Sequence, residues 1–322
     1  MKKIILVLIV LLLFLGFTPY HELNNLAVVD VMGLELKNNK YILHLNVIND
    51  DNKIYTVKGD SLGEVFMKAK NVSNKKTYYK HLEVVIFNTD VLTNKKKIIN
   101  FFKDEFTSID YLVLSYNGDL SNIFNKYHKR NDYKSFIKKE KEESGFIINV
   151  TFKDFLSDSL DSTKTANIPL IDVNNSLYSK GLYLPNINYI VPINLVRASY
   201  LLRGDINSYS EKIKINNNYY EVFLYDLRSS IKYKNNTLNI VINGNIDSPD
   251  SNHLDCVKEE VKKIILNDIN SLIKSERSNK YNISNIINYI YLKERDDAFK
   301  YYKNSKVNIE INLDEERKNN YG

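Results

Sequence analysis

Runs of hydrophobic residues divide the first half of the chain into predicted strands. Residues 27–36 and 41–48 are rich in β-branched residues and flank Lys37-Asn38-Asn39-Lys40, where asparagine tolerates the positive φ of a tight hairpin turn. Residues 82–87 and 111–116 are short continuous apolar runs, which predict buried strands. We expect the last two strands to belong to a small α/β unit.

Apolar residues recur with helical spacing between these strands. Ser61 precedes such a segment, which extends to about residue 71, and Glu64 follows at the position that completes a capping box. Further helices are predicted over residues 89–102, 120–128 and 134–143. The last of these is rich in Lys and Glu, which predicts an exposed helix.

The sequence pattern in the second half of the chain predicts longer strands and a longer helix. Residues 219–227 and 238–244 predict antiparallel strands, and residues 307–313 alternate apolar with polar side chains as a half-buried strand does. Residues 254–274 carry one apolar stripe at helical spacing, which predicts a long amphipathic helix. We expect the closing strand to join the sheet that begins near Tyr219.

These elements predict an α+β fold with several domains, in which helices pack on mixed sheets. Asp, Ser, Thr and Asn cluster between residues 157 and 179, which indicates a connection between two regions. We divide the chain into an N-terminal segment over residues 1–20, an α/β region over residues 21–166 and an α+β domain over residues 167–322.

The N-terminal segment has the pattern of a signal peptide or membrane anchor. Lys2 and Lys3 precede an unbroken apolar run over residues 4–17, which is shorter than the ~20 residues of an ordinary transmembrane helix. No small-x-small cleavage site follows in residues 16–20, so the segment is either an uncleaved short anchor or cleaved at a poor site. The two lysines place the N-terminus in the cytoplasm and the remainder outside, as an ectodomain.

Composition changes this picture only slightly. The chain has 322 residues, of which 43% are hydrophobic and 26% charged, so it can bury a core and disorder is not expected. The formal net charge of +6 is spread along the chain among acidic residues, which argues against a nucleic-acid-binding surface. It is compatible with a weak attraction to an anionic membrane surface.

The sequence contains few residues that could form a catalytic, metal-binding or cofactor-binding site. The single cysteine, Cys256, excludes an intramolecular disulfide and a cysteine-based zinc site, and we expect it to be a small buried hydrophobe rather than a reactive thiol. The five histidines are isolated, and His44 and His81 are expected to be structural. The sequence contains no G-x-S-x-G elbow and no G-x-x-x-x-G-K-[ST] phosphate loop. It therefore predicts no catalytic, cofactor-binding or metal site, and a protein that is not an enzyme. The 24 tyrosines are expected to serve core and interface packing.

Five ordered segments resemble the Ger(x)C family of spore germination proteins. They are residues 22–35 (ELNNLAVVDVMGLE), 59–64 (GDSLGE), 79–87 (YKHLEVVIF), 98–104 (IINFFKD) and 111–115 (YLVLS). The long helix from Leu254 and the closing segment over residues 307–311 match the family in kind and order. The resemblance is weak over residues 129–220.

The resemblance implies a C-type subunit of a nutrient germinant receptor at the outer face of the spore inner membrane. Its partners would be a polytopic A-type subunit, a transmembrane B-type subunit and the membrane surface, with no nucleic acid, no cofactor and no catalytic activity. The family usually carries a lipidated cysteine just before the first of these segments, and Phe17 occupies that position here. Without the thiol, attachment would depend on the N-terminal segment or on the partner subunits.

Two other classes of function stay open. A stand-alone, membrane-anchored extracytoplasmic protein that binds a small solute or cell-wall fragment is compatible with the tyrosine content and the α/β order. A surface hydrolase has the least support, because no nucleophile and base are recognisable in the sequence.

Overall fold

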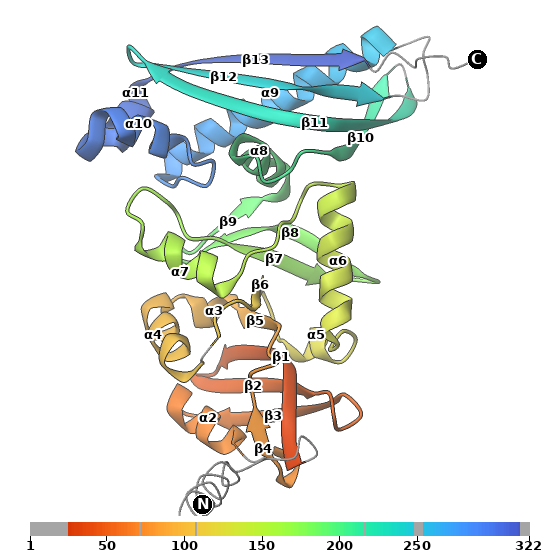
Figure 1. Ribbon diagram of the computed structural model, residues 1–322, viewed down its shortest axis with the longest axis vertical. Helices are drawn as coiled ribbons and strands as arrows, with labels where there is room; N and C mark the ends of the chain where they lie inside the picture. The colour runs from red at the N-terminus through yellow and green to blue at the C-terminus, as the bar shows by residue number, and fades with distance from the viewer. Residues whose placement is uncertain (1–24, 71, 107, 216, 248–253, 316–322) are drawn as a thin grey trace, which may run out of the picture.

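Two mixed β-sheets follow one another along the long axis of the molecule, in a computed structural model (Figure 1). The structure describes residues 25–70, 72–106, 108–215, 217–247 and 254–315. The first sheet consists of β1 (Leu26–Lys37), β2 (Lys40–Val47), β3 (Lys53–Gly59), β4 (Lys76–Tyr78), β5 (Val84–Asn88), β6 (Leu112–Tyr116), β7 (Ile168–Val173), β8 (Leu177–Leu184) and β9 (Tyr189–Pro192). The second consists of β10 (Tyr209–Ile215), β11 (Asn218–Lys234), β12 (Thr237–Asp247) and β13 (Lys306–Glu315).

The first sheet has a parallel centre and antiparallel ends. Its strand order is β3-β2-β1-β5-β6-β7-β8-β9, and β4 pairs with the start of β1. The pairs β1–β5, β5–β6 and β6–β7 are parallel, whereas β2–β3 and β8–β9 lie at antiparallel ends of the sheet. The continuous apolar runs of β5 and β6 agree with this arrangement, because central parallel strands are buried on both faces.

Local chemistry forms the first hairpin as predicted. Lys37 pairs with Lys40, and Asn38 and Asn39 have φ values of 52° and 62°. Two successive residues with positive φ are the requirement of a type I′ turn, whose twist matches that of the flanking strands. The predicted strands and turn at the start of the chain are therefore confirmed.

Helices cover both faces of the first sheet. One face holds α2 (Leu62–Ala69), α3 (Thr89–Leu92), α4 (Lys95–Glu105) and α7 (Phe152–Leu160), and the other holds α5 (Ser121–Phe124) and α6 (Arg130–Glu143). A short 3-10 turn, η2 (Val72–Asn74), follows α2. The Ser61 side chain accepts a hydrogen bond from the Glu64 backbone N–H at 3.2 Å, which confirms the predicted start of α2.

Two predicted helices are shorter or broken in the structure. The single helix expected over residues 89–102 is divided at Thr93 and Asn94, because Asn94 begins a new helix by accepting a hydrogen bond from the Lys97 backbone N–H. The helix expected over residues 120–128 is the single turn α5. Asparagine competes for backbone hydrogen bonds, which the apolar spacing alone does not reveal.

The second sheet has one helical face. α9 (Leu254–Asn279) buries the predicted apolar stripe against it, through Val257, Val261, Ile265, Ile269 and Leu272. α10 (Ile286–Glu294), the 3-10 turn η4 (Arg295–Asp297) and α11 (Ala298–Asn304) follow. β13 then pairs with β12, which confirms the expected return of the closing strand, and the pairing is parallel.

Cys256 corrects one sequence-based expectation. It is exposed on α9 instead of being a buried hydrophobe. Val257, the next residue, begins the buried stripe at 0% exposure. Adjacent helical residues differ by about 100° in direction, so Cys256 faces away from the sheet.

α8 (Ile193–Arg203) lies between the two sheets (Figure 1). It begins directly after β9, contacts β8, β9, β11 and α9, and is buried over most of its length. One hydrophobic cluster runs through both sheets by way of this helix, from Ala27 to Leu313. The sequence analysis did not predict α8, because a helix buried all round shows no amphipathic stripe.

The sheet topology bears on the proposed domain division. The boundary between residues 166 and 167 falls inside the first sheet, where β7 pairs with β6 on one side and β8 on the other. The division stays a prediction, and the topology favours a boundary after β9, where α8 leads to the second sheet. The α+β fold class with mixed sheets is confirmed.

The predicted N-terminal segment, residues 1–20 with Phe17, lies outside the described residues. Within the part of the chain that the structure describes, none of the helices combines the length and the hydropathy that crossing a bilayer requires.

Candidate functional site

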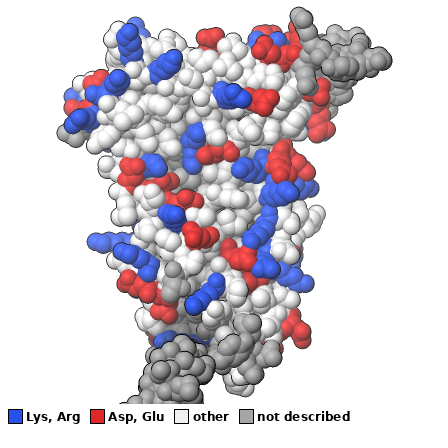
Figure 2. Space-filling model, viewed as in Figure 1, with Lys and Arg blue, Asp and Glu red and all other residues white. Residues whose placement is uncertain are grey.

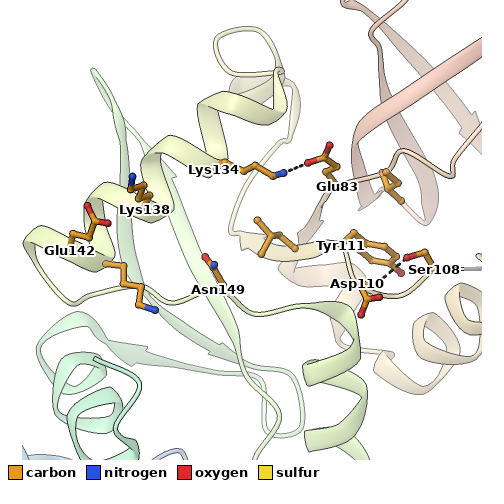
Figure 3. A pocket seen from close by; sticks show the side chains of 11 residues that line it. Glu83, Ser108, Asp110, Tyr111, Lys134, Lys138, Glu142 and Asn149 are labelled. Carbon is orange, nitrogen blue, oxygen red and sulfur yellow. Dashed lines mark hydrogen bonds and ion pairs between the residues drawn. The ribbon is translucent and has the colours of Figure 1, made fainter. Parts of the chain in front are cut away.

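A groove opens beside α6, at the amino ends of β5 and β6 (Figure 3). We call it the α6 groove; its volume is about 520 Å³. One wall is the lysine-bearing side of α6, and the opposite wall is the turn that leads into β6. The lining residues are Leu82, Glu83, Ser108, Asp110, Tyr111, Leu112, Lys134, Lys138, Lys141, Glu142 and Asn149.

Glu83 organises the charges at one end of the α6 groove. Its carboxylate forms ion pairs with Arg130 and Lys134, the latter drawn in Figure 3. Partial burial raises the pKa of Glu83, but the hydrogen bonds and charges of the two cations outweigh it, so the pKa lies below its ordinary value. Glu83 is therefore ionised at neutral pH and ties the start of α6 to the entry of β5.

The buried carboxyl group of Asp30 forms a hydrogen bond with the start of α6. Asp30 is 2% exposed, accepts a hydrogen bond from Asn46 Nδ2 at 2.7 Å, and accepts another from the backbone N–H of Arg130. Burial raises the pKa of Asp30, and these hydrogen bonds oppose the rise. Asp30 thus joins β1, β2 and α6, which is a structural role.

The α6 groove carries no recognisable catalytic constellation. Its charges are of both signs: α6 contributes Lys134, Lys138, Lys141 and Glu142, and the opposite wall contributes Glu83 and Asp110. Among the described residues there is no group of three or more His, Cys, Asp or Glu side chains that could hold a metal ion. Lys, Arg, Asp and Glu are interspersed over this whole face of the molecule (Figure 2). Such a surface suits polar contact with another macromolecule better than chemistry on a small substrate.

A second polar site lies at α8, between the two sheets. Arg197 is 8% exposed and forms ion pairs with Glu211 on β10 and, at 3.6 Å, with Asp268 on α9. Its guanidinium lies 4.4 Å from the ring centroid of Tyr209 and 5.2 Å from that of Phe146. Burial raises the pKa of Asp268, and the charge of Arg197 opposes this effect. We call this cluster the α8 joint, because it connects elements of both regions.

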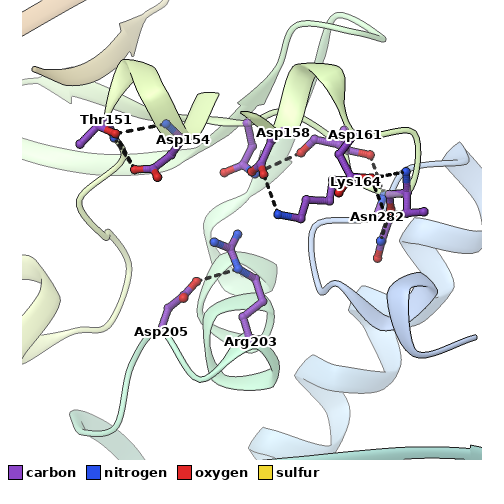
Figure 4. A network of polar contacts seen from close by, with 11 residues as sticks. Thr151, Asp154, Asp158, Asp161, Lys164, Arg203, Asp205 and Asn282 are labelled. Carbon is purple, nitrogen blue, oxygen red and sulfur yellow. Dashed lines mark hydrogen bonds and ion pairs between the residues drawn. The ribbon is translucent and has the colours of Figure 1, made fainter. Parts of the chain in front are cut away.

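Polar contacts around α7 also join the two regions (Figure 4). Asn282, which follows α9, donates from its backbone N–H to Thr165 Oγ1 at 2.8 Å and from Nδ2 to the Thr163 carbonyl at 2.6 Å. Lys164 of the same loop forms an ion pair with Asp158 at 3.0 Å. The loop that follows α7 is thereby fastened to the C-terminal helices.

The histidines singled out in the sequence do not form a site together. His44 lies in β2 at 4% exposure, its Nδ1 is 3.2 Å from Thr56 Oγ1, and its ring stacks on Phe124. Its Nε2 has no hydrogen-bond partner, and burial lowers its pKa to about 4. His81 lies in the turn before β5, with its ring 5.8 Å from that of Tyr78. His44 is therefore a core residue in which one ring nitrogen, Nδ1, has a hydrogen-bond partner and the other does not.

Sequence reasoning missed Arg197 and Asn282. Both owe their position to residues far away in the chain, and Asn282 lies 117 residues from Thr165. No local pattern could have identified them. The expectation for the tyrosines is confirmed for those that are fully buried: Tyr133, Tyr183, Tyr200, Tyr209, Tyr281 and Tyr302.

Comparison with known families gives a match over the first sheet. Residues 19–173 match the family model described as "Spore germination protein N-terminal domain". The matched range extends from before β1 to the end of β7, and therefore contains the α6 groove. A comparison with curated proteins found no match.

The fold is similar to that of the GerBC protein, as seen in its crystal structure. The two superpose with a TM-score of 0.57 over 88% of this chain and 96% of that chain. The sequences are 9% identical, so this likeness concerns the fold alone.

Proposed function

We propose that this chain, a member of the Ger(x)C family of spore germination proteins, is a non-catalytic C-type subunit of a nutrient germinant receptor. Its role is in receptor assembly or signalling during spore germination. The partners are an A-type subunit and a B-type subunit in the inner membrane of the spore.

The match of residues 19–173 to the germination domain is the observation that carries this proposal. It agrees with the five segments that resemble the family, which all lie within the matched range. The mixed-charge α6 groove lies in the same domain and offers a polar surface to a partner subunit. The α8 joint connects this domain to the second sheet, so a contact at one can be transmitted to the other.

The place where the described chain begins is compatible with attachment at the N-terminal end. β1 starts at the end of the molecule opposite the second sheet (Figure 1). Attachment by the N-terminal segment at the outer face of the membrane therefore holds the first sheet near the bilayer and the second sheet away from it. Because Phe17 stands where the family usually has a lipidated cysteine, attachment would depend on the apolar N-terminal run or on the partner subunits.

Fractionation of spores and vegetative cells tests this proposal. Quantitative immunodetection is expected to find the protein in the inner-membrane fraction of dormant spores, protected from added protease while the membrane vesicles keep their outer face inside. Detection in the soluble fraction of vegetative cells, and never in spores, contradicts the proposal.

A further inference from the structure

A second groove lies where the loops of the first region meet the C-terminal helices. We call it the C-terminal groove; its volume is about 430 Å³. Residues 162–165 and the β8–β9 turn line one side, and residues 280–282, α10, η4 and α11 line the other. Sites between two regions of a chain are common places for ligand binding.

Apolar side chains remain accessible in the C-terminal groove. Tyr291 is 39% exposed and Ile187 is 42% exposed, from opposite sides of the groove. Phe299 is half-buried beside them, and Ile287 is buried below. Together they form a surface that an apolar or aromatic side chain can cover, which removes exposed hydrophobic area from water.

A buried hydrogen-bond acceptor in the same groove lacks a partner. Asn282 is 3% exposed and both its Nδ2 and its backbone N–H are used in contacts with the loop after α7. Its Oδ1 has no hydrogen-bond partner. A buried acceptor that is left unpaired destabilises the protein, so an N–H donor that a ligand brings to this position forms a favourable hydrogen bond.

The charges of the C-terminal groove are all positive. Its lining contains Lys164, Lys280 and Arg295 and no Asp or Glu. Lys164 is paired with Asp158, whereas Lys280 and Arg295 form no ion pair in the part of the chain that the structure describes. Arg295 has φ 48° and ψ −113°, a conformation that costs energy for a residue with a side chain and that gathers at functional sites.

We propose that the C-terminal groove binds the C-terminal residue of a peptide with an apolar or aromatic last side chain. The side chain covers Tyr291, Ile187 and Phe299, the amide N–H donates to Asn282 Oδ1, and the terminal carboxylate interacts with Lys280 and Arg295. This goes beyond the proposed subunit role and does not depend on it.

The positive charges of the C-terminal groove favour a peptide C-terminus over a free amino acid. A free amino acid carries an ammonium group, which three cations disfavour, whereas the amide of a peptide is neutral. The α6 groove differs, because its lining contains both acidic and basic residues. The C-terminal groove therefore favours a ligand with a single negative charge and a neutral N–H donor.

Calorimetric titration of the full chain in detergent micelles tests the ligand class. N-acetyl-L-phenylalanine is expected to bind saturably, and N-acetyl-L-phenylalaninamide, which lacks the carboxylate, about tenfold more weakly. Free L-phenylalanine is expected to bind more weakly than the acetylated acid. Equal binding of the acid and the amide overturns the proposal, as does no binding of the acid.

Two variants and one control locate the binding. Arg295→Gln is expected to remove most of the difference between the acid and the amide, and Tyr291→Ala is expected to weaken both ligands about tenfold. Lys300→Gln makes the same charge change on the exposed side of α11, outside the groove, and is expected to change nothing. Thermal melting confirms that each variant is folded. Unchanged binding in both groove variants contradicts the proposed place.

The source of the peptide terminus is tested in spore membranes. A photoreactive residue at position 162, which lines the groove but makes none of the proposed contacts, is expected to crosslink to a protein if the terminus belongs to a partner subunit. If the acid binds in the titration and position 162 gives no protein adduct, the terminus belongs to a free peptide, and the ligand class stands.

Discussion

His44 couples protonation to folding at the scale of a single residue. Burial holds its pKa at about 4, below the 6.5 of an exposed imidazole. Between pH 6.5 and pH 4, His44 is protonated in the unfolded chain but neutral in the folded chain. The neutral His44 therefore adds to the free energy of unfolding in full above pH 6.5, and this contribution is lost as the pH falls toward 4. The loss amounts to about 3 kcal/mol over the whole interval.

The variant His44→Gln is expected to flatten this pH dependence. Urea unfolding of the wild-type chain and the variant at pH 7 and at pH 4.5 gives the difference in free energy of unfolding between them. We expect that difference to shrink at the lower pH, because glutamine has no proton to gain. Parallel pH profiles contradict the assigned burial of His44.

Glu276 is a buried carboxylate whose partners are all donors. It is 0% exposed and accepts hydrogen bonds from the backbone N–H groups of Ile283 and Ser284, both at 2.8 Å, from Ser284 Oγ at 2.8 Å and from Tyr302 Oη at 2.6 Å. Burial raises its pKa, and the hydrogen bonds from Tyr302 and Ser284 oppose the rise. Glu276 thereby fastens α9 to α10 and α11.

Glu276→Gln is expected to lower the free energy of unfolding by about 1–3 kcal/mol, because its amide group places a donor against donors. Glu259→Gln is the matched control on the exposed side of the same helix, where an ion pair with Lys262 contributes little. Chemical denaturation of both variants and the wild-type chain measures these changes in the free energy of unfolding. Equal effects would show that the buried network of Glu276 is not formed.

At the scale of elements, Gly33 explains how α5 packs on β1. A Cβ at this position would lie 2.5 Å from Phe124 Cε2 and 2.9 Å from its Cζ. The ring of Phe124 in turn stacks on His44 of β2. The glycine in the segment that resembles the family is therefore needed for close packing between a strand and a helix.

Gly33→Ala is expected to destabilise the fold by about 1–3 kcal/mol, since Phe124 must move out of a packed core. Gly63→Ala on α2 is the control, because a Cβ there meets no atom within 4 Å and alanine favours the helix. The double variant Gly33→Ala/Phe124→Leu is expected to recover part of the loss. A neutral Gly33→Ala in urea unfolding contradicts this packing.

The α8 joint can be tested by removing its cation. Arg197→Met leaves Glu211 and Asp268 largely buried without a partner, and breaking such a pair costs about 3 kcal/mol or more. Adding Glu211→Gln and Asp268→Asn is expected to restore part of the stability. Lys274→Met on the exposed side of α9 is the control. If thermal melting is the same for Arg197→Met and the control, the joint does not hold the two regions.

The elements that the sequence predicted are those defined by nearby residues. The type I′ turn at Asn38-Asn39 and the stripe of α9 depend on backbone preference and on spacing within one segment. α8 depends on burial between the two sheets, and the strands β7 to β9 depend on pairing within the first sheet, neither of which a segment displays by itself. Neither the α8 joint nor the C-terminal groove could be predicted, because their residues meet only after folding.

At the scale of the whole molecule, the two sheets and the joint between them form one continuous structure, with β1 at one end and the second sheet at the other (Figure 1). In the arrangement that we propose, a partner subunit in the membrane would lie close to the first sheet, which contains most of the range that matches the germination domain and also the α6 groove. The second sheet and the C-terminal groove are then available to a contact farther from the bilayer. This arrangement is suited to a protein that works by binding at two places.

The most direct test of the subunit role is an affinity purification of the tagged chain from detergent-solubilised inner membranes of dormant spores. Mass spectrometry of the eluate is expected to identify a polytopic A-type subunit and a B-type subunit at amounts comparable to the bait, and none in an untagged control. Recovery of the intact chain alone, at good yield, contradicts the subunit role and favours a stand-alone extracytoplasmic binding protein.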